Sequence, residues 1–200
     1  MKIGLDIGST TTKAVVLDPQ THDVLYSTYR RHFAHQVESL ETVVKEVFAR
    51  FPDRPCRFSM SGSGSKGLAA QLGIPYIQEV VANATAVQKL YPNARCAIEL
   101  GGQDAKMIFF ERDGQTGAMT VTDMRMNGSC AGGTGAFIDE IAALLKIDVE
   151  RLDDAAAAGC TVYDISGRCG VYAKTDIQPL LNAGARKEDL ALSTFHAIAK

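Results

Sequence analysis

Hydrophobic and polar positions in the first part of the chain predict three strands followed by a helix. Short apolar runs cover residues 2–7 and 13–17, and positions 24–33 alternate between apolar and polar side chains. Alternation of this kind is typical of a strand with one buried face. Between residues 36 and 51 apolar side chains recur at helical spacing, and Pro52 ends the pattern. We therefore expect a β-meander followed by a crossover helix.

The remaining pattern predicts a strand directly after the first helix, several further helices and a break between two domains. The strand pattern covers residues 56–60. Helical patterns cover, in chain order, residues 66–72, 78–90, 136–145, 171–181 and 188–198. Pro92 and Asn93 interrupt the chain between the second and third of these helices. We expect an α/β protein whose first domain covers residues 1–92 and whose second covers residues 93–200.

The surroundings of Asp6 are repeated around Glu99. In each copy an acidic residue closes an apolar strand and a turn of small residues follows. A lysine seven positions after the acid, Lys13 or Lys106, then opens a second apolar strand. Two unrelated hairpins would explain either copy alone. Two copies in the same register are better explained by two related domains, whose equivalent turns lie across a shared cleft, a common place for ligands.

A carboxylate at a strand end beside a glycine-rich turn suits a magnesium phosphate ligand. The turn directs N–H groups at anionic oxygens, and the carboxylate holds the hydrated cation through water. The candidate nucleotide ligands are Asp6, Gly8, Ser9, Thr10, Thr11, Lys13, Gly101, Gly102 and Lys106. The candidate catalytic residues are Glu99, the second carboxylate for the hydrated cation, and Gln103 and Asp104, which are placed to orient water or metal. The paired turns predict a nucleotide clamp.

Other candidate sites in the first half are weaker. Residues 62–67 match the pattern G-x-G-x-x-G between a predicted strand and a predicted helix. A dinucleotide site would also need a second strand ending in an acid about 20 residues later, but residues 78–90 have a helical pattern. His32 and His35 stand next to two arginines, so we expect a solvated strand end there rather than a metal site.

Composition and charge exclude several classes of protein. The 200 residues carry a net charge of −2, with 21 basic residues scattered among 23 acidic ones, so no basic stripe favours nucleic acid. The longest stretch without charge, residues 126–138, is shorter than the roughly 18 residues that a membrane span needs. Asp6 interrupts the apolar region of any secretion signal. We expect a cytoplasmic protein that binds neither nucleic acid nor membrane.

The five cysteines form no C-x-x-C pair, which argues against a disulfide framework. Cys130 and Cys169 each precede a predicted helix, whose first N–H groups and dipole stabilise a thiolate. Zinc and iron–sulfur sites usually need four ligands, so a symmetric dimer would have to supply the other two. Burial as a small apolar side chain is our expectation for Cys56, Cys96 and Cys160, and stays the alternative for the other two.

The duplicated hairpin resembles the acetate and sugar kinase, Hsp70 and actin superfamily. The resemblance covers nearly the whole chain and implies two ribonuclease-H-like domains that hold ATP between two phosphate-binding hairpins. Glu99 stands where many members have aspartate, which lengthens the reach by one methylene and keeps the role. The helical pattern of residues 188–198 runs to Lys200 without a stop signal. We therefore expect the second domain to be incomplete at its C-terminus, without the adenosine pocket that follows in such proteins.

Four strings of residues are similar to one family of that superfamily: MNGSCAGGTGAFIDE, GRCGVYAKTDIQPLLNAGARKEDL, IGLDIGSTTTK and AIELGGQDAK. They resemble the ATP-dependent activators of 2-hydroxyacyl-CoA dehydratases and the ATPase subunits of benzoyl-CoA reductase, the BadF/BadG/BcrA/BcrD type. The second string is most similar to the long, multidomain activator-like form, whose N-terminal part this chain would match.

This resemblance implies an ATPase coupled to electron transfer in anaerobic metabolism. The implied cofactors are ATP, Mg²⁺ and one 4Fe-4S cluster shared by a homodimer and held by Cys130 and Cys169 of each subunit. The implied partners are a dehydratase or reductase component and an electron donor such as ferredoxin or flavodoxin. Two alternatives stay open: a small-molecule kinase on the same scaffold, with Asp104 as its base, and a non-catalytic actin-like or zinc-linked dimer.

Overall fold

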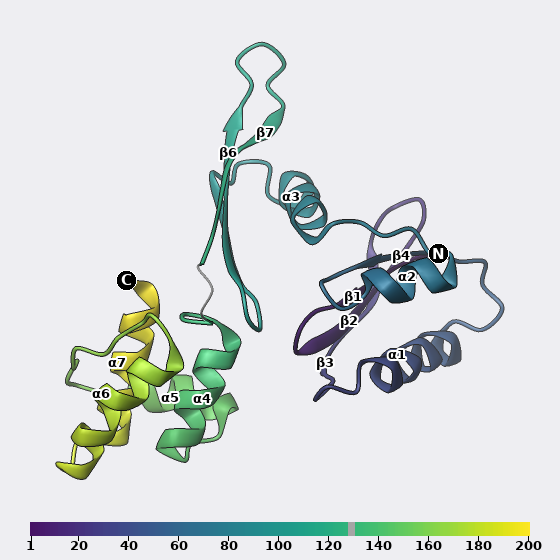
Figure 1. The fold of residues 1–200 in the computed structure, drawn as a ribbon. Helices are drawn as coiled ribbons and strands as arrows, with labels where there is room; N and C mark the ends of the chain where they lie inside the picture. Colours follow the sequence, from purple (N-terminus) through teal and green to yellow (C-terminus); the bar gives the residue numbers. More distant parts are fainter. Residues whose placement is uncertain (128–130) are drawn as a thin grey trace. The chain divides into compact units, whose positions relative to one another are not determined.

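A computed structural model describes residues 1–127 and 131–200 of the chain (Figure 1). The strands are β1 (Lys2–Ile7), β2 (Thr11–Leu17), β3 (Val24–Arg31), β4 (Arg57–Ser61), β5 (Cys96–Leu100), β6 (Ala105–Arg112) and β7 (Met119–Met126). The helices are α1 (Gln36–Arg50), α2 (Lys66–Leu72), α3 (Glu79–Leu90), α4 (Gly135–Leu145), the 3₁₀ turn η1 (Val149–Arg151), α5 (Leu152–Ala157), α6 (Gly170–Asn182) and α7 (Lys187–Ala199). The chain divides into two compact units, Met1–Arg95 with Arg112–Met119 and Cys96–Glu111 with Thr120–Lys200.

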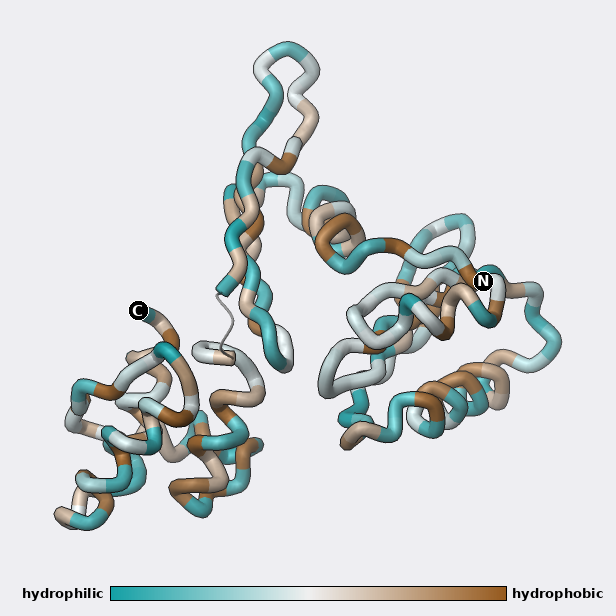
Figure 2. The backbone as a smooth tube through the Cα atoms, in the orientation of Figure 1, coloured by the Kyte–Doolittle hydropathy of each residue, from teal (hydrophilic) through white to brown (hydrophobic). Residues whose placement is uncertain are grey.

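The first unit contains a four-stranded sheet in the order β3-β2-β1-β4. β1 is antiparallel to β2 and parallel to β4, and β2 is antiparallel to β3. Ile3, Leu5 and Ile7 alternate along β1 and form one buried face. They share a core with Leu40 and Val43 of α1. Apolar and polar residues recur in turn along α1 (Figure 2), as in a helix with one side on a core.

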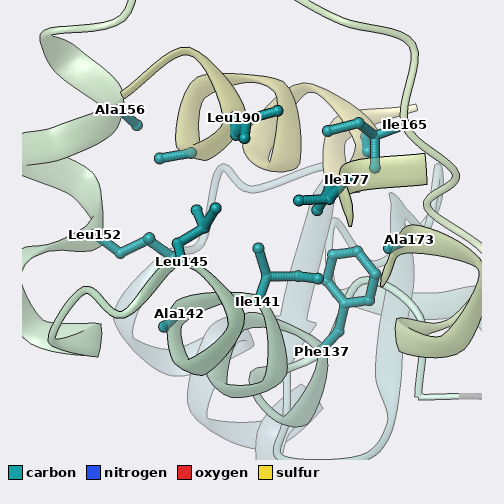
Figure 3. Packing of buried hydrophobic residues seen from close by; sticks show 12 residues of the cluster. Phe137, Ile141, Ala142, Leu145, Leu152, Ala156, Ile165, Ala173, Ile177 and Leu190 are labelled. Atoms are coloured by element: carbon teal, nitrogen blue, oxygen red, sulfur yellow. The ribbon is translucent and has the colours of Figure 1, made fainter. Parts of the chain in front are cut away.

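The second unit contains a three-stranded sheet in the order β5-β6-β7, in which β5 and β6 are antiparallel. Helices α4 to α7 form its apolar core. Phe137, Ile141 and Leu145 recur every four residues on α4 and are buried. They pack in one cluster with Ile177 of α6 and Leu190 of α7 (Figure 3). The spacing that predicted the helix is therefore also the spacing that builds the core.

Every strand and helix predicted from the pattern is present, with bounds that agree within two residues. β7, η1 and α5 were not predicted. The division into domains 1–92 and 93–200 stays a prediction. Among the described helices none combines the length and the apolar character that a membrane crossing requires.

The expected burial of two cysteines is wrong, because Cys96 and Cys160 are exposed, and Cys56 is only half-buried. Cys96 begins β5, the edge strand, on which every second residue is exposed. Cys160 lies in the loop that follows α5. An apolar run in the sequence does not reveal which face of an edge strand remains uncovered.

Candidate nucleotide and cysteine sites

The first candidate turn joins β1 to β2. The Gly8 N–H donates to the Thr11 carbonyl oxygen at 2.9 Å, which closes the turn. Asp6 and Lys13 are partners across the two strands, and the Lys13 Nζ lies 3.0 Å from Asp6 Oδ1. Both side chains are partly exposed, at 27% for Asp6 and 40% for Lys13. The carboxylate and the ammonium therefore lie side by side at the turn and remain accessible to a ligand.

The second candidate turn joins β5 to β6 in the same way. The Gly101 N–H donates to the Asp104 carbonyl oxygen at 2.8 Å. Glu99 and Lys106 are partners across the strands, with 3.6 Å between Nζ and Oε2. The repeat predicted from the sequence is thus a repeat of strand pairing, turn hydrogen bond and ion pair. Here the lysine is 95% buried, since only 5% of its side chain is exposed.

The remaining predicted residues lie in these two turns. Ser9 and Thr10 are half-buried at the tip of the first turn, and Thr11 is buried at the start of β2. Gln103 and Asp104 are exposed in the second turn. The structure therefore brings each predicted set together within its own hairpin. The two hairpins belong to different units.

His32, directly after β3, contacts the first turn and is a functional candidate that was not expected from the sequence. It is buried, with 4% of its surface exposed, so the expected solvated strand end is wrong. Its backbone N–H donates to the Thr10 oxygen at 3.1 Å. Its ring Nε2 lies 3.1 Å from the Gly8 oxygen, and the Ala34 N–H donates to Nδ1 at 3.2 Å. His35 is exposed, as expected.

The glycine-rich segment after β4 packs behind the first turn. The Gly64 N–H donates to the Ile7 oxygen at 2.8 Å. Gly62 has φ +96°, and a Cβ there would lie 2.3 Å from the same oxygen. Close backbone packing explains these glycines without a dinucleotide. In addition, the segment that would carry a second strand is helix α3.

The second turn is held by the N-terminus of α4. The Gly135 N–H donates to the Gly101 oxygen at 2.9 Å, and the Ala136 N–H donates to the Gly102 oxygen at 2.9 Å. The first N–H groups of a helix have no acceptor within the helix. Here the carbonyl oxygens of the turn are those acceptors. The start of α4 and the second turn are consequently one hydrogen-bonded piece.

Cys169 lies beside the start of α4. It is the half-buried N-cap residue of α6. It lines a hollow of about 260 Å³ with Ala131, Ala136, Phe137, Glu140, Gly170 and Val171. Cys130 lies outside the described residues, but Ala131, the next residue in the chain, lines the same hollow. At Gly132 a Cβ would lie 2.2 Å from the Arg168 oxygen, so the backbones before α4 and before α6 pack against each other.

Two carboxylates, one on α6 and one on α7, accept hydrogen bonds from the backbone of the loop that leads to Cys169. Asp176 accepts the Ser166 N–H at 2.9 Å. Asp189 accepts the N–H groups of Cys160 at 2.7 Å and Thr161 at 3.0 Å. These hydrogen bonds, the one from Cys160 first, hold the pKa of the Asp189 carboxyl below its usual value. Within residues 1–127 and 131–200 no three histidine, cysteine or acidic side chains form a metal site.

Comparison with known proteins gives a consistent result. The profile of the BadF/BadG/BcrA/BcrD ATPase family matches residues 3–200. The chain is 26% identical over 199 residues to the (R)-2-hydroxyglutaryl-CoA dehydratase activating ATPase of Acidaminococcus fermentans, which covers 98% of this chain and 74% of that protein. It is 26% identical over 211 residues to the 2-hydroxyisocaproyl-CoA dehydratase activator of Clostridioides difficile, covering 99% of this chain and 72% of that protein.

Solved structures are similar over the same length. The crystal structure of the A. fermentans (R)-2-hydroxyglutaryl-CoA dehydratase component A matches with a TM-score of 0.83 and 25% identity, over 99% of this chain and 74% of that one. The C. difficile activator with bound ADPNP matches with a TM-score of 0.80 and 26% identity, over 99% of this chain and 72% of that one. The α/β fold of this chain is the fold of these activators.

Proposed function

Because the chain belongs to the BadF/BadG/BcrA/BcrD ATPase family, we propose that it hydrolyses ATP in order to pass a low-potential electron to a 2-hydroxyacyl-CoA dehydratase or a related reductase component. Relatives that match nearly the whole chain are named as activators of such dehydratases. The observation in this chain that supports the proposal most directly is the duplicated hairpin, with an acid, a glycine turn and a lysine in each copy.

Each hairpin offers groups that suit magnesium and the phosphates of ATP. Asp6 and Glu99 place a carboxylate beside a turn, where it can hold a hydrated Mg²⁺ through water. Lys13 and Lys106 lie beside these acids and would balance phosphate charge. The exposed Gln103 and Asp104 of the second turn would orient the attacking water, which places the catalytic groups on the second hairpin.

Cys169 and its surroundings fit a ligand of an iron–sulfur cluster. The sulfur sits at the N-cap of α6, where the helix dipole stabilises negative charge. The hollow around it is mostly apolar, with Phe137 and Val171 in its lining. Cys130 would be the second ligand of the same chain, so two chains would supply the four thiolates of one 4Fe-4S cluster. When bound, such a cluster supplies low-potential one-electron transfer, with ferredoxin or flavodoxin as the donor.

The connection between the second turn and the cysteines supports a coupling between ATP and electron transfer. Nucleotide that displaces the Gly101 or Gly102 carbonyl acts on the first N–H groups of α4. The residues before α4 contact the Arg168 backbone, which precedes Cys169. A shift of the turn would therefore change the hydrogen bonds and the solvent exposure at the thiolate, two properties that set the reduction potential of a cluster.

Anaerobic purification followed by iron, sulfide and mass analysis tests the cluster. We expect a brown dimer with about four iron ions per two chains, and loss of both iron and dimer in Cys169→Ser. Cys160→Ser is the matched control, because Cys160 is exposed and does not line the hollow. A monomer that retains a full cluster, or a colourless dimer with stoichiometric zinc, would contradict the shared cluster.

Reconstitution with a 2-hydroxyacyl-CoA dehydratase tests the function. Activation should need the reduced protein together with ATP, and ADPNP should not replace ATP through repeated turnovers. Transfer of the terminal phosphate to a small molecule instead of water would favour the kinase alternative. The cytoplasmic location expected from the sequence stays a prediction.

A further inference from the structure

His32 uses both nitrogens of a buried ring to connect the first turn to the backbone beyond β3. Its Nε2 contacts the Gly8 oxygen and its Nδ1 contacts the Ala34 N–H. Because the Ala34 N–H can only donate, Nδ1 must carry the lone pair. Because the Gly8 carbonyl can only accept, Nε2 must carry the proton. The contacts therefore select one neutral tautomer of the imidazole.

The two residues directly after His32, one of which donates to its ring, adopt a costly backbone conformation. Phe33 has φ +47° and Ala34 has φ +67°, the left-handed region that residues other than glycine rarely occupy. The Phe33 side chain is 76% exposed, so its own burial does not compensate for the strain. Strained residues of this kind persist where the surroundings hold them, and they gather at functional sites.

The same peptide group is held in both hairpins, by different donors. Gly8 in the first turn corresponds to Gly101 in the second, since each donates its N–H to the residue three positions later. The Gly101 oxygen accepts from the backbone of Gly135, whereas the Gly8 oxygen accepts from the His32 ring. In a trans peptide the carbonyl and the next N–H point in opposite directions. Fixing the Gly8 carbonyl toward the buried His32 ring therefore aims the Ser9 N–H away from that ring.

We propose that His32 is a positioning residue that orients the Gly8–Ser9 peptide, so that the Ser9 N–H is preset to bind a phosphate oxygen of the nucleotide. This proposal rests on the proposed function of the first turn. The relevant property is hydrogen-bond donation from the Nε2 position, and not the bulk of the ring. A donor fixed before the ligand arrives costs nothing to reorganise on binding, which is the benefit of preorganisation.

Two substitutions distinguish the contact of the ring with Gly8 from its contact with Ala34. His32→Gln carries an amide N–H that can reach the Gly8 oxygen, whereas His32→Asn is shorter and can only replace the Nδ1 acceptor for Ala34. We expect the KM for MgATP to rise about tenfold in His32→Asn, the equivalent of one hydrogen bond, with kcat changed less. His32→Gln should restore KM to within about twofold of the wild-type value. His35→Asn is the control, because His35 is three positions away and its side chain is 75% exposed.

Nitrogen NMR of the His32 ring provides a readout that does not depend on ATP. We expect the Nε2–H tautomer in the nucleotide-free protein, and a ring protonated on Nδ1 would overturn the proposal even if ATP is hydrolysed. Equal KM values for folded His32→Gln and His32→Asn would also overturn it. If His32→Asn fails to fold, the tautomer of the wild-type ring and the KM of His32→Gln for MgATP still test the proposal. Turnover unaffected by Asp6→Ala would instead refute the proposed site, and with it this role for His32.

Discussion

The two hairpins have the same skeleton but are held by different parts of the molecule. In both, an acid and a lysine pair across the strands and a glycine N–H closes the turn. The first turn is held by the side chain of His32, which directly follows the strand β3. The second turn is held by the first N–H groups of α4. Ala131, which precedes α4, lines the same hollow as Cys169. Under the proposed function, the first turn would bind phosphate only, whereas the second would bind it and also pass the effect of binding on to Cys169.

Burial also differs between the two hairpins. Lys106 is 5% exposed, whereas Lys13 is 40% exposed and lies 5.6 Å above the Tyr29 ring. A buried ammonium must keep an anionic partner, because an isolated charge in the interior is costly. The Glu99–Lys106 pair is therefore the more sensitive to loss of one member, while the first pair can exchange its partner for water or a ligand.

Removing either acid should give the largest effect, since both hairpins are proposed to carry magnesium or phosphate. Asp6→Asn and Glu99→Gln keep the shape and remove the charge, and each should lower ATP turnover about a hundredfold. Glu99→Gln should also destabilise the fold, because it removes a negative charge that lies 3.6 Å from the buried Lys106 ammonium. Glu41→Gln, which removes an exposed helix ion pair, is the control. Turnover that survives one of the two substitutions would break the equivalence of the hairpins.

Replacing the equivalent glycines Gly8 and Gly101 by alanine should have an intermediate effect, which differs between the two hairpins. A Cβ at Gly101 would lie 2.7 Å from the Asp104 oxygen, whereas a Cβ at Gly8 would lie 3.7 Å from the Thr11 oxygen. The first distance requires the backbone to move and the second is an ordinary contact. We expect Gly101→Ala to lower the free energy of unfolding by about 1–3 kcal/mol, with Gly8→Ala nearly neutral, in denaturant titrations. Equal losses would show that the second turn is no tighter than the first.

The smallest effect is expected at Asp189, which accepts hydrogen bonds from Cys160 and Thr161 in the loop that leads to Cys169. The lowered pKa of the Asp189 carboxyl means that its hydrogen bonds stabilise the fold at pH values above its unfolded pKa. That contribution is lost as the pH falls through the lower folded value. Asp189→Asn should therefore lower the melting temperature at neutral pH by a few degrees, about the effect of one hydrogen bond. The gap to the wild type should narrow in acid, and a gap independent of pH would exclude the ionised carboxylate as its cause.

The elements and the repeated hairpins were predictable because their signals are local. Apolar spacing predicted α4 from Phe137 and Ile141, and the seven-residue distance from acid to lysine is visible in the chain itself. β7 gives little apolar contrast, since nearly all of its residues are exposed, and η1 and α5 are too short for a clear period.

The contacts that distinguish the two turns could not be predicted in the same way. His32 is buried and is followed directly by the left-handed residues Phe33 and Ala34, a conformation for which their sequence gives no signal. The hydrogen bonds from Gly135 and Ala136 to the second turn join residues more than thirty positions apart, and no periodicity encodes them. Sequence thus predicted which residues form each turn, but not what holds the turn.

Nucleotide bound at the second turn should change the surroundings of Cys169, and thiol alkylation of the iron-free protein tests this coupling most directly. Peptide mapping reads the rate at Cys169 with and without Mg-ADPNP, and Cys160 serves as the internal control. We predict that the nucleotide changes the Cys169 rate at least about fivefold, within the usual range of coupling between sites, and leaves the Cys160 rate unchanged. The change should disappear in Gly101→Ala. Identical Cys169 rates in the presence and absence of nucleotide, with binding confirmed separately, would contradict the claim.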